Sequence, residues 1–140
     1  MAKKYRFFDD IATADAAFEA YGKDLPELFT NSALATFSVM AELKRVAPKI
    51  KKEIALQNPS TDGLLFDFIQ ELIYLKDADY MLFSKFTVQI AGGNLAATAY
   101  GEHINPKKHQ LLTDVKAMTL HMYSVQRTKS GWKAFIILDT

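Results

Sequence analysis

The sequence predicts an α+β fold, with two helices packed against a mainly antiparallel sheet in a single domain that spans residues 1–140. Two amphipathic helical patterns occur in the first part of the chain, whereas short alternating apolar segments separated by turn residues fill the second part. Strands and helices do not alternate in the βαβ rhythm that builds parallel sheets. A chain of 140 residues also fits one domain with one core.

Two short strands and one helix are expected first. Residues 5–8 are aromatic and strand-like, and residues 16–21 form a second strand candidate. Asp24, with Glu27 three residues later, has the spacing of an N-terminal capping box. Apolar and small residues then recur at i, i+3 and i+4 through Met40, so one face of this helix is expected to be buried.

Residues 42–57 are expected to form an exposed edge strand or hairpin. Pro48 cannot donate a hydrogen bond, so it excludes a position in the middle of a sheet. A turn cluster at residues 58–63 ends with residues that favour the start of a helix. The second helix is expected at residues 64–76. It is apolar around most of its circumference, and it should therefore be largely buried.

The remaining chain is expected to be a succession of strands. Alternating segments at residues 83–90 and 95–100 flank a glycine-rich turn at residues 92–94, which is typical of a hairpin. A polar loop follows, and a long strand is expected at residues 115–126. The run at residues 132–138 is apolar to its end, so the last strand should be held in the sheet and should not fray.

The composition is that of an ordinary soluble protein. Apolar residues make up 49% and charged residues 24%, and the formal net charge of +1 favours neither nucleic acid nor an acidic membrane surface. The absence of cysteine excludes disulfides, thiolate metal sites and cysteine nucleophiles, and it suits a reducing interior. No signal-peptide pattern and no run of roughly 20 apolar residues is present. We therefore expect a cytoplasmic protein.

The sequence contains no established catalytic motif. There is no Ser-His-Asp setting, no P-loop and no dinucleotide fingerprint, and the glycine pair at residues 92–93 lies between two strands. His103, His109 and His121 lack the close spacing of a helical zinc site. On the long strand expected at residues 115–126, His121 would share a face with the residues two positions away. This pattern is more typical of a structural histidine than of a general base.

Oxygen ligands near the two ends of the chain remain. Asp139 and Thr140 close the last strand with two anionic groups, and fixed anions are costly unless a cation meets them. If Asp15 lies beside Asp139, two carboxylates and an oxygen of Thr140 would suit Ca²⁺ or Mg²⁺ better than Zn²⁺. Two plainer interpretations stay open. The strand could simply stop with Asp139 in solvent, and Asp15 could serve a turn or a helix cap.

Six segments, in a fixed order along almost the whole chain, carry a further signal. They are Thr13-Ala14-Asp15, Glu19-Ala20-Tyr21-Gly22-Lys23, Leu64–Leu75, Ala99-Tyr100-Gly101-Glu102, Val115–His121 and Gly131–Thr140. Any one of them is a weak match, but together they resemble the archease family, whose members assist the tRNA-splicing RNA ligase. Lys116 and His121 belong to the matching segments, although no chemical role follows for them.

The resemblance implies a strand-helix-strand-strand module that carries an inserted, similar unit. It also implies an accessory protein that promotes guanylylation and repeated turnover of the ligase. The family's metal site would fall on Asp15, Asp139 and Thr140, with Ca²⁺ as the expected ion and Mg²⁺ or Mn²⁺ as alternatives. The chain departs from the family pattern at Ala12, because a histidine usually stands there. This departure leaves open what that imidazole contributes to metal binding or to ligase activation.

Other functions remain to be weighed against this one. A non-catalytic ligand- or protein-binding module of the same fold would have no ligase partner and only structural carboxylates. A metal-dependent hydrolase is disfavoured because there is no nucleophile and there are few ligands, so we expect no enzyme activity. RNA is expected to be met only indirectly, through the ligase, because the lysines form only short basic patches. The lysines in question are Lys49, Lys51, Lys52, Lys107 and Lys108.

Overall fold

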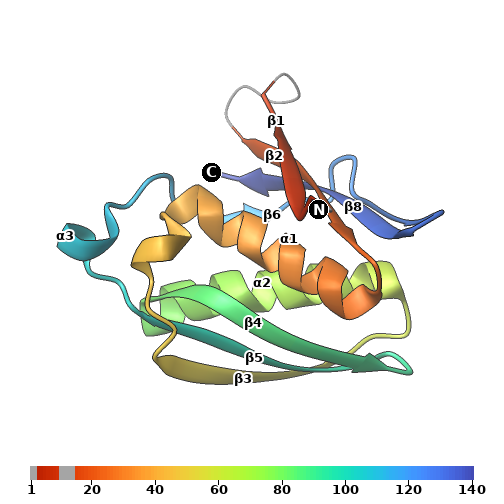
Figure 1. Ribbon diagram of the computed structural model, residues 1–140, viewed down its shortest axis with the longest axis horizontal. Coiled ribbons are helices and arrows are strands. Elements are labelled where there is room, and N and C mark those ends of the chain that lie inside the picture. The colour runs from red at the N-terminus through yellow and green to blue at the C-terminus, as the bar shows by residue number, and fades with distance from the viewer. Residues whose placement is uncertain (1–2, 10–14) are drawn as a thin grey trace.

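Two antiparallel sheets lie on either side of two long helices in the computed structural model, which describes residues 3–9 and 15–140. Figure 1 shows α1 and α2 as the middle layer, with β1, β2 and β8 above them and β3, β4 and β5 below. This arrangement confirms the expected α+β class. The elements in chain order are β1 (Tyr5–Phe8), β2 (Ala16–Gly22), α1 (Leu25–Met40), the 3₁₀ helix η1 (Leu43–Arg45), β3 (Ile50–Gln57), α2 (Thr61–Asp79), β4 (Met81–Ala91), β5 (Asn94–His103), α3 (Pro106–His109), β6 (Ala117–Met118), β7 (Ser124–Thr128) and β8 (Gly131–Asp139).

The two sheets share one topological unit, although the first has five strands and the second has three. In the first sheet the order is β1-β2-β8, and both β6 and β7 pair with the free side of β8. In the second sheet the order is β3-β5-β4. The units β2-α1-β7-β8 and β3-α2-β4-β5 are therefore both strand-helix-strand-strand, and in both the first strand pairs with the last. The second unit lies between α1 and β6 in the chain, as the expected inserted unit should.

Local signals in the sequence set the starts of both helices. The Asp24 carboxylate accepts a hydrogen bond from the Glu27 backbone N–H at 2.9 Å, and the Glu27 carboxylate accepts one from the Lys23 N–H at 2.9 Å. The Ser60 hydroxyl caps α2 by accepting a hydrogen bond from the Gly63 N–H at 2.8 Å. The helix, Thr61–Asp79, extends beyond the expected residues 64–76 at both ends. The predicted capping chemistry is confirmed.

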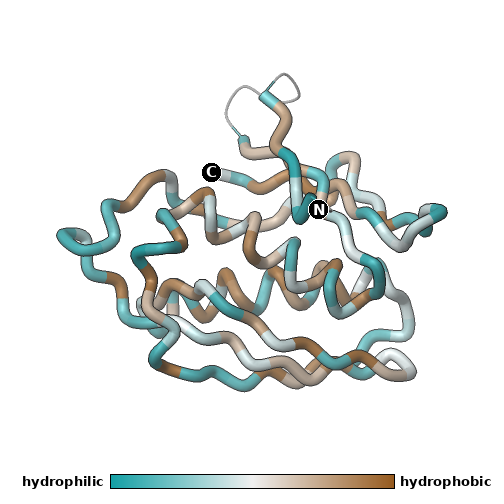
Figure 2. Tube along the Cα trace, viewed as in Figure 1, coloured by the Kyte–Doolittle hydropathy of each residue, from teal (hydrophilic) through white to brown (hydrophobic). Residues whose placement is uncertain are grey.

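One core fills the space between the layers. Five phenylalanines from both sheets and both helices are fully buried, and the ring centroids of the pairs Phe29–Phe68 and Phe37–Phe83 lie 5.8 and 5.5 Å apart. Figure 2 shows hydrophobic stretches along the helices and β8, and hydrophilic residues at the turns. No helix in the described ranges is long and apolar enough to cross a membrane.

Lys76 is an exception to the apolar surface of α2, because it is buried with 3% of its surface exposed. Its Nζ atom donates hydrogen bonds to the Asp114 carboxylate at 2.6 Å and to the Val115 carbonyl at 2.8 Å, and it lies 2.8 Å from the Asp77 carboxylate. A buried ammonium group needs such partners because desolvation is costly. Lys76 thereby fixes the segment that leads into β6.

The prediction of one long strand at residues 115–126 is wrong. The structure has two short strands, β6 and β7, separated by a turn in which residues 120–122 are exposed and Met122 has φ +56°. The Tyr123 hydroxyl donates to the Asp62 carbonyl at 2.7 Å and its ring packs against Phe66, which draws this segment toward α2. His121 is therefore exposed in a turn, and it does not lie on the face of a strand.

Candidate functional site

The end of β8 is the place where the sequence expects a metal site. The strands β2 and β8 are antiparallel, and their register pairs Ala16 with Leu138. Asp15 directly precedes β2 and Asp139 ends β8. When the register is continued by one residue, the backbone of Asp15 stands opposite Asp139. The fold therefore brings together two residues that are far apart in the sequence.

The Asp139 carboxylate belongs to the outer face of the sheet. Ile136 and Leu138 are fully buried in the core between the layers, so side-chain alternation directs Asp139 to the opposite face. Asp15 lies in the bend directly before β2, and only a continuation of the β2 register would put its side chain on the same side. Both aspartates are exposed. Like charges directly opposite each other destabilise a sheet by roughly 0.2–1 kcal/mol.

No cation in the described part of the chain neutralises this pair. Neither aspartate takes part in an ion pair within residues 3–9 and 15–140. The carbonyl of Asp139 accepts a hydrogen bond from the Lys116 N–H at 2.8 Å, and Asp139 pairs with Ala117 of β6, so β6 and the residue before it hold the backbone of Asp139. The Asp139 backbone is therefore fixed, while its carboxylate faces solvent.

The expected metal donors are oxygens. No group of three or more His, Cys, Asp or Glu side chains within the described ranges is arranged to hold a metal ion. The expected set thus consists of two carboxylates and an oxygen of Thr140, which is half-buried. Oxygen donors fit a hard cation such as Ca²⁺ or Mg²⁺. Residues 12–14, which include the Ala12 position of the family pattern, lie outside the described residues.

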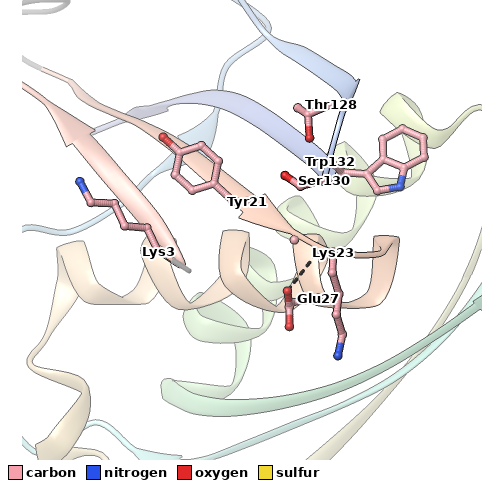
Figure 3. A pocket seen from close by; sticks show the side chains of 8 residues that line it. Lys3, Tyr21, Lys23, Glu27, Thr128, Ser130 and Trp132 are labelled. Carbon is pink, nitrogen blue, oxygen red and sulfur yellow. Dashed lines mark hydrogen bonds between the residues drawn. The ribbon is translucent and has the colours of Figure 1, made fainter. Parts of the chain in front are cut away.

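A cavity of about 380 Å³ lies at the opposite end of β8 (Figure 3). Its side chains come from the N-terminal segment, the junction of β2 with α1 and the β7–β8 hairpin, and they include Tyr21, Lys23 and Trp132. The Arg127 guanidinium lies 5.0 Å from the centre of the Trp132 ring. Trp132 is seven residues from Asp139, which corresponds to about 23 Å along a strand. The cavity is thus separate from the carboxylate pair.

Glu102 anchors a polar network that the sequence analysis missed. Its carboxylate is 12% exposed and accepts hydrogen bonds from the Ala47 N–H at 2.9 Å, from His109 Nε2 at 2.7 Å and from Lys108 Nζ at 2.7 Å. The other ring nitrogen of His109 accepts the Asn105 N–H at 2.9 Å, so the Nε2 proton points at Glu102. These partners are scattered along the chain, and no spacing in the sequence connects them.

The network makes the free energy of unfolding sensitive to acid. Burial alone would raise the pKa of Glu102, but the hydrogen bonds from His109, Lys108 and Ala47 and the charge of Lys108 outweigh it and lower the pKa from 4.5 to about 2. A lowered carboxylate pKa stabilises the fold fully above about pH 4.5, and this contribution is lost as the pH falls toward 2.

We therefore expect Glu102→Gln to lower the free energy of unfolding by roughly 2–3 kcal/mol at pH 7 and to flatten its pH dependence between pH 4.5 and 2. Urea denaturation at several pH values measures both effects. Glu53→Gln, at an exposed position of β3, is the matched control and should retain the wild-type slope. An unchanged slope in the Glu102 variant would contradict the role given to this carboxylate.

Known proteins resemble this chain along its whole length. A model of the Archease protein family matches residues 5–140. Curated archeases from Methanothermobacter thermautotrophicus and Methanosarcina mazei are 40% and 35% identical over 141 and 142 residues, which cover 98% of this chain and 99% and 96% of theirs.

Solved structures agree with this match. The solution structure of Methanobacterium thermoautotrophicum protein 1598 has a TM-score of 0.85 and 38% identity, and the match covers 98% of this chain and 99% of that one. A crystal structure of an archease from Thermotoga maritima, described as a possible chaperone, has a TM-score of 0.66 at 20% identity and covers 92% of this chain and 93% of that one. At this identity the second similarity shows the fold alone.

Proposed function

Because the chain belongs to the archease family, we propose that it is an accessory protein of the tRNA-splicing RNA ligase and is not itself an enzyme. It promotes guanylylation of the ligase and its repeated turnover in tRNA splicing or RNA repair. This role is the one that the family resemblance implies. Its site is a divalent-metal site made by Asp15, Asp139 and Thr140.

The observation that carries the proposal is the β2–β8 register. The last pair of this register, Ala16 with Leu138, directly adjoins two exposed aspartates. Neighbouring carboxylates repel each other, and a divalent cation removes this repulsion. Ca²⁺ takes six to eight oxygen ligands, so three protein groups leave positions open for water and for groups of a partner. A bound cation supplies positive charge that neutralises developing negative charge on phosphoryl oxygens.

The chain's own residues position this site for a partner. The Asp139 backbone is fixed by its hydrogen bond with the Lys116 N–H and by pairing with β6, and its side chain is exposed at the end of the sheet. A partner's active site can approach the carboxylates from solvent without any rearrangement of the core. An exposed pair of carboxylates suits delivery or positioning of a cation at the surface of another protein better than it suits a closed catalytic centre.

The direct test is a multiple-turnover reaction of a purified tRNA-splicing RNA ligase with excess RNA substrate and GTP. Addition of this protein is expected to raise the steady-state ligation rate about tenfold or more, which equals at least roughly 1.4 kcal/mol of barrier. A single-turnover reaction with pre-guanylylated ligase is the control, and it should respond less. A ligation rate that is the same with and without the protein would contradict the proposed function.

A second candidate is a ligand- or protein-binding module without a ligase partner. The feature that favours it is the cavity beside Trp132, which is remote from the carboxylates and large enough for a small ligand. The alanine at position 12 also removes an imidazole that the family usually has. Capture of a different partner, together with no effect on any RNA ligase, would favour this module over the accessory role.

A further inference from the structure

Positive charge gathers on one end of the second sheet. Residues 44–52 and 100–108 contain seven of the 17 Lys and Arg residues of the chain but one of its 16 Asp and Glu residues. The chain as a whole has a formal net charge of only +1, so the rest of it is net acidic. The charge is therefore segregated in space, although the overall balance hides it.

The fold joins the two basic segments, which are separate in the sequence. The N–H of Lys49 donates to the Gly101 carbonyl at 3.0 Å, and the Glu102 carboxylate binds both the Ala47 N–H and Lys108 Nζ. Figure 1 shows α3, η1 and the start of β3 at the same end of the molecule, and Figure 2 shows hydrophilic residues there. The two short basic patches of the sequence therefore belong to one surface of the folded protein.

An aromatic side chain lies within this charge. The register places Lys51 of β3 and Lys85 of β4 on either side of Tyr100 in β5, and Lys85 Nζ is 5.0 Å from the centre of the Tyr100 ring. Tyr100 is half-buried. No helix covers this outer face of the sheet in Figure 1, because α1 and α2 lie on the other side. We call Lys49, Lys51, Lys85, Lys107, Lys108 and Tyr100 the basic surface.

A groove of about 510 Å³ continues the basic surface toward α3. It is lined by Lys49, His103, Asn105 and Lys108 among others. Its one acidic lining residue, Glu102, already accepts three hydrogen bonds, which compensate its charge. Within the described ranges, none of the large exposed hydrophobic side chains lines it. The apolar residues that line it are Ile50, Ile104 and Pro106, and a groove without an aromatic anchor does not fit a typical protein–protein hot spot.

Several of these cations lack an intramolecular partner. Lys49, Lys51 and Lys107 are exposed, and none takes part in an ion pair within residues 3–9 and 15–140. Unpaired lysines around a groove, next to an aromatic ring on an open sheet face, are the combination that binds single-stranded nucleic acid through its phosphates and bases. We propose that the basic surface binds single-stranded nucleic acid directly.

This proposal changes the expectation that RNA is met only through the ligase. The surface lies on the second sheet, whereas the carboxylate pair ends the first sheet, so the two sites are physically separate. Binding of the strand rests on the lysines and on Tyr100, and it does not require a metal ion. The Asp139→Ala variant is therefore expected to bind the strand as tightly as the wild-type protein does, whatever it does to a ligase.

The test is fluorescence anisotropy of a labelled oligoadenylate RNA of about 12 nucleotides, with DNA of the same sequence as a second arm to identify which nucleic acid is preferred. Wild-type protein is expected to bind with a Kd of roughly 1–100 µM, and binding should weaken steeply between about 50 and 200 mM salt. The triple variant Lys49→Ala, Lys51→Ala, Lys107→Ala is expected to bind about tenfold more weakly, with a shallower salt slope.

A matched triple variant separates location from net charge. Lys4→Ala, Lys23→Ala, Lys129→Ala removes the same charge from exposed positions outside the basic surface, and it should change the Kd by less than about twofold. Equal losses in the two triple variants would show that only bulk charge matters and would overturn the proposal. Competition experiments give a second way to overturn it. If polyglutamate displaced the labelled strand as well as unlabelled RNA of equal total charge does, the surface would be a general anion site.

Tyr100 provides an independent readout. Tyr100→Phe keeps a ring for stacking and should bind like the wild type, whereas Tyr100→Ala should bind about fivefold or more weakly with an unchanged salt slope. A loss of affinity with an unchanged salt slope indicates lost stacking, because the salt slope depends on the number of phosphate contacts. Wild-type levels of binding by a folded Tyr100→Ala variant would overturn the part assigned to the ring.

Discussion

Replacing Gly101 by alanine is expected to lower the free energy of unfolding by about 4 kcal/mol and the Tm by roughly 15 °C. Gly101 lies in β5 where β4 is irregular, at the register shift between Phe83 and Lys85. A Cβ atom at this position would overlap the carbonyl oxygen of Leu82 and would lie 2.8 Å from the Phe83 Cα. Both neighbours are backbone, so the strands themselves would have to move apart.

Gly92→Ala is the matched control for this experiment. Gly92 has φ +57°, but a Cβ atom there would meet nothing within 4 Å, so the cost is confined to the left-handed backbone, about 1–2 kcal/mol. Urea denaturation of both variants measures the difference. If Gly101→Ala lost no more stability than Gly92→Ala, the close approach of β4 and β5 would not be the constraint at this position.

Replacing Asp139 by alanine is expected to reduce stimulation of the ligase to near background, a loss of about tenfold or more in multiple-turnover rate. The side chain is exposed, and a continuation of the β2–β8 register by one residue brings Asp15 beside it, so its removal should leave the protein folded and slightly stabilise it, by roughly 0.2–1 kcal/mol. Loss of function without loss of stability is the signature of a functional carboxylate. Full stimulation by this variant would contradict the role assigned to Asp139.

A metal titration gives the same variant a second readout. Calcium binding measured by calorimetry is expected for the wild-type protein and should weaken by at least about tenfold in Asp139→Ala, because a ligand is lost. Glu53→Ala removes one exposed strand carboxylate from the other sheet and is the matched control. It should retain both calcium binding and ligase stimulation. If both variants lost calcium binding and ligase stimulation to the same extent, the loss would reflect only the change in net charge.

The elements that the sequence predicts best are those specified by local chemistry. Asp24 and Glu27 form the expected helix cap, and the glycines at residues 92–93 take positive φ values in the expected hairpin. The terminal run becomes β8, in the middle of its sheet. In each case the information lies within a few residues, so a pattern can reveal it.

The failures have a common cause in contacts between distant residues. The expected strand at residues 115–126 is interrupted because Tyr123 bonds to the backbone of Asp62, some 60 positions earlier. Glu102 joins the segments around Ala47 and Lys108 in the same way. Of the expected site, the juxtaposition of Asp15 with Asp139 follows from the β2–β8 register, but the metal itself stays a prediction.

The nested arrangement of the two units has a consequence for how the chain folds. The second sheet comes from one continuous segment, residues 50–103, whereas the first sheet pairs β2 with β8 across more than a hundred intervening residues. Closing the larger loop costs more chain entropy, so we expect the inner unit to form early and to bring the two ends of the outer unit close together. The carboxylate pair then assembles only when β2 pairs with β8, in the last step of folding. A cation at this site would therefore bind the fully folded protein and would not bind a partly folded intermediate.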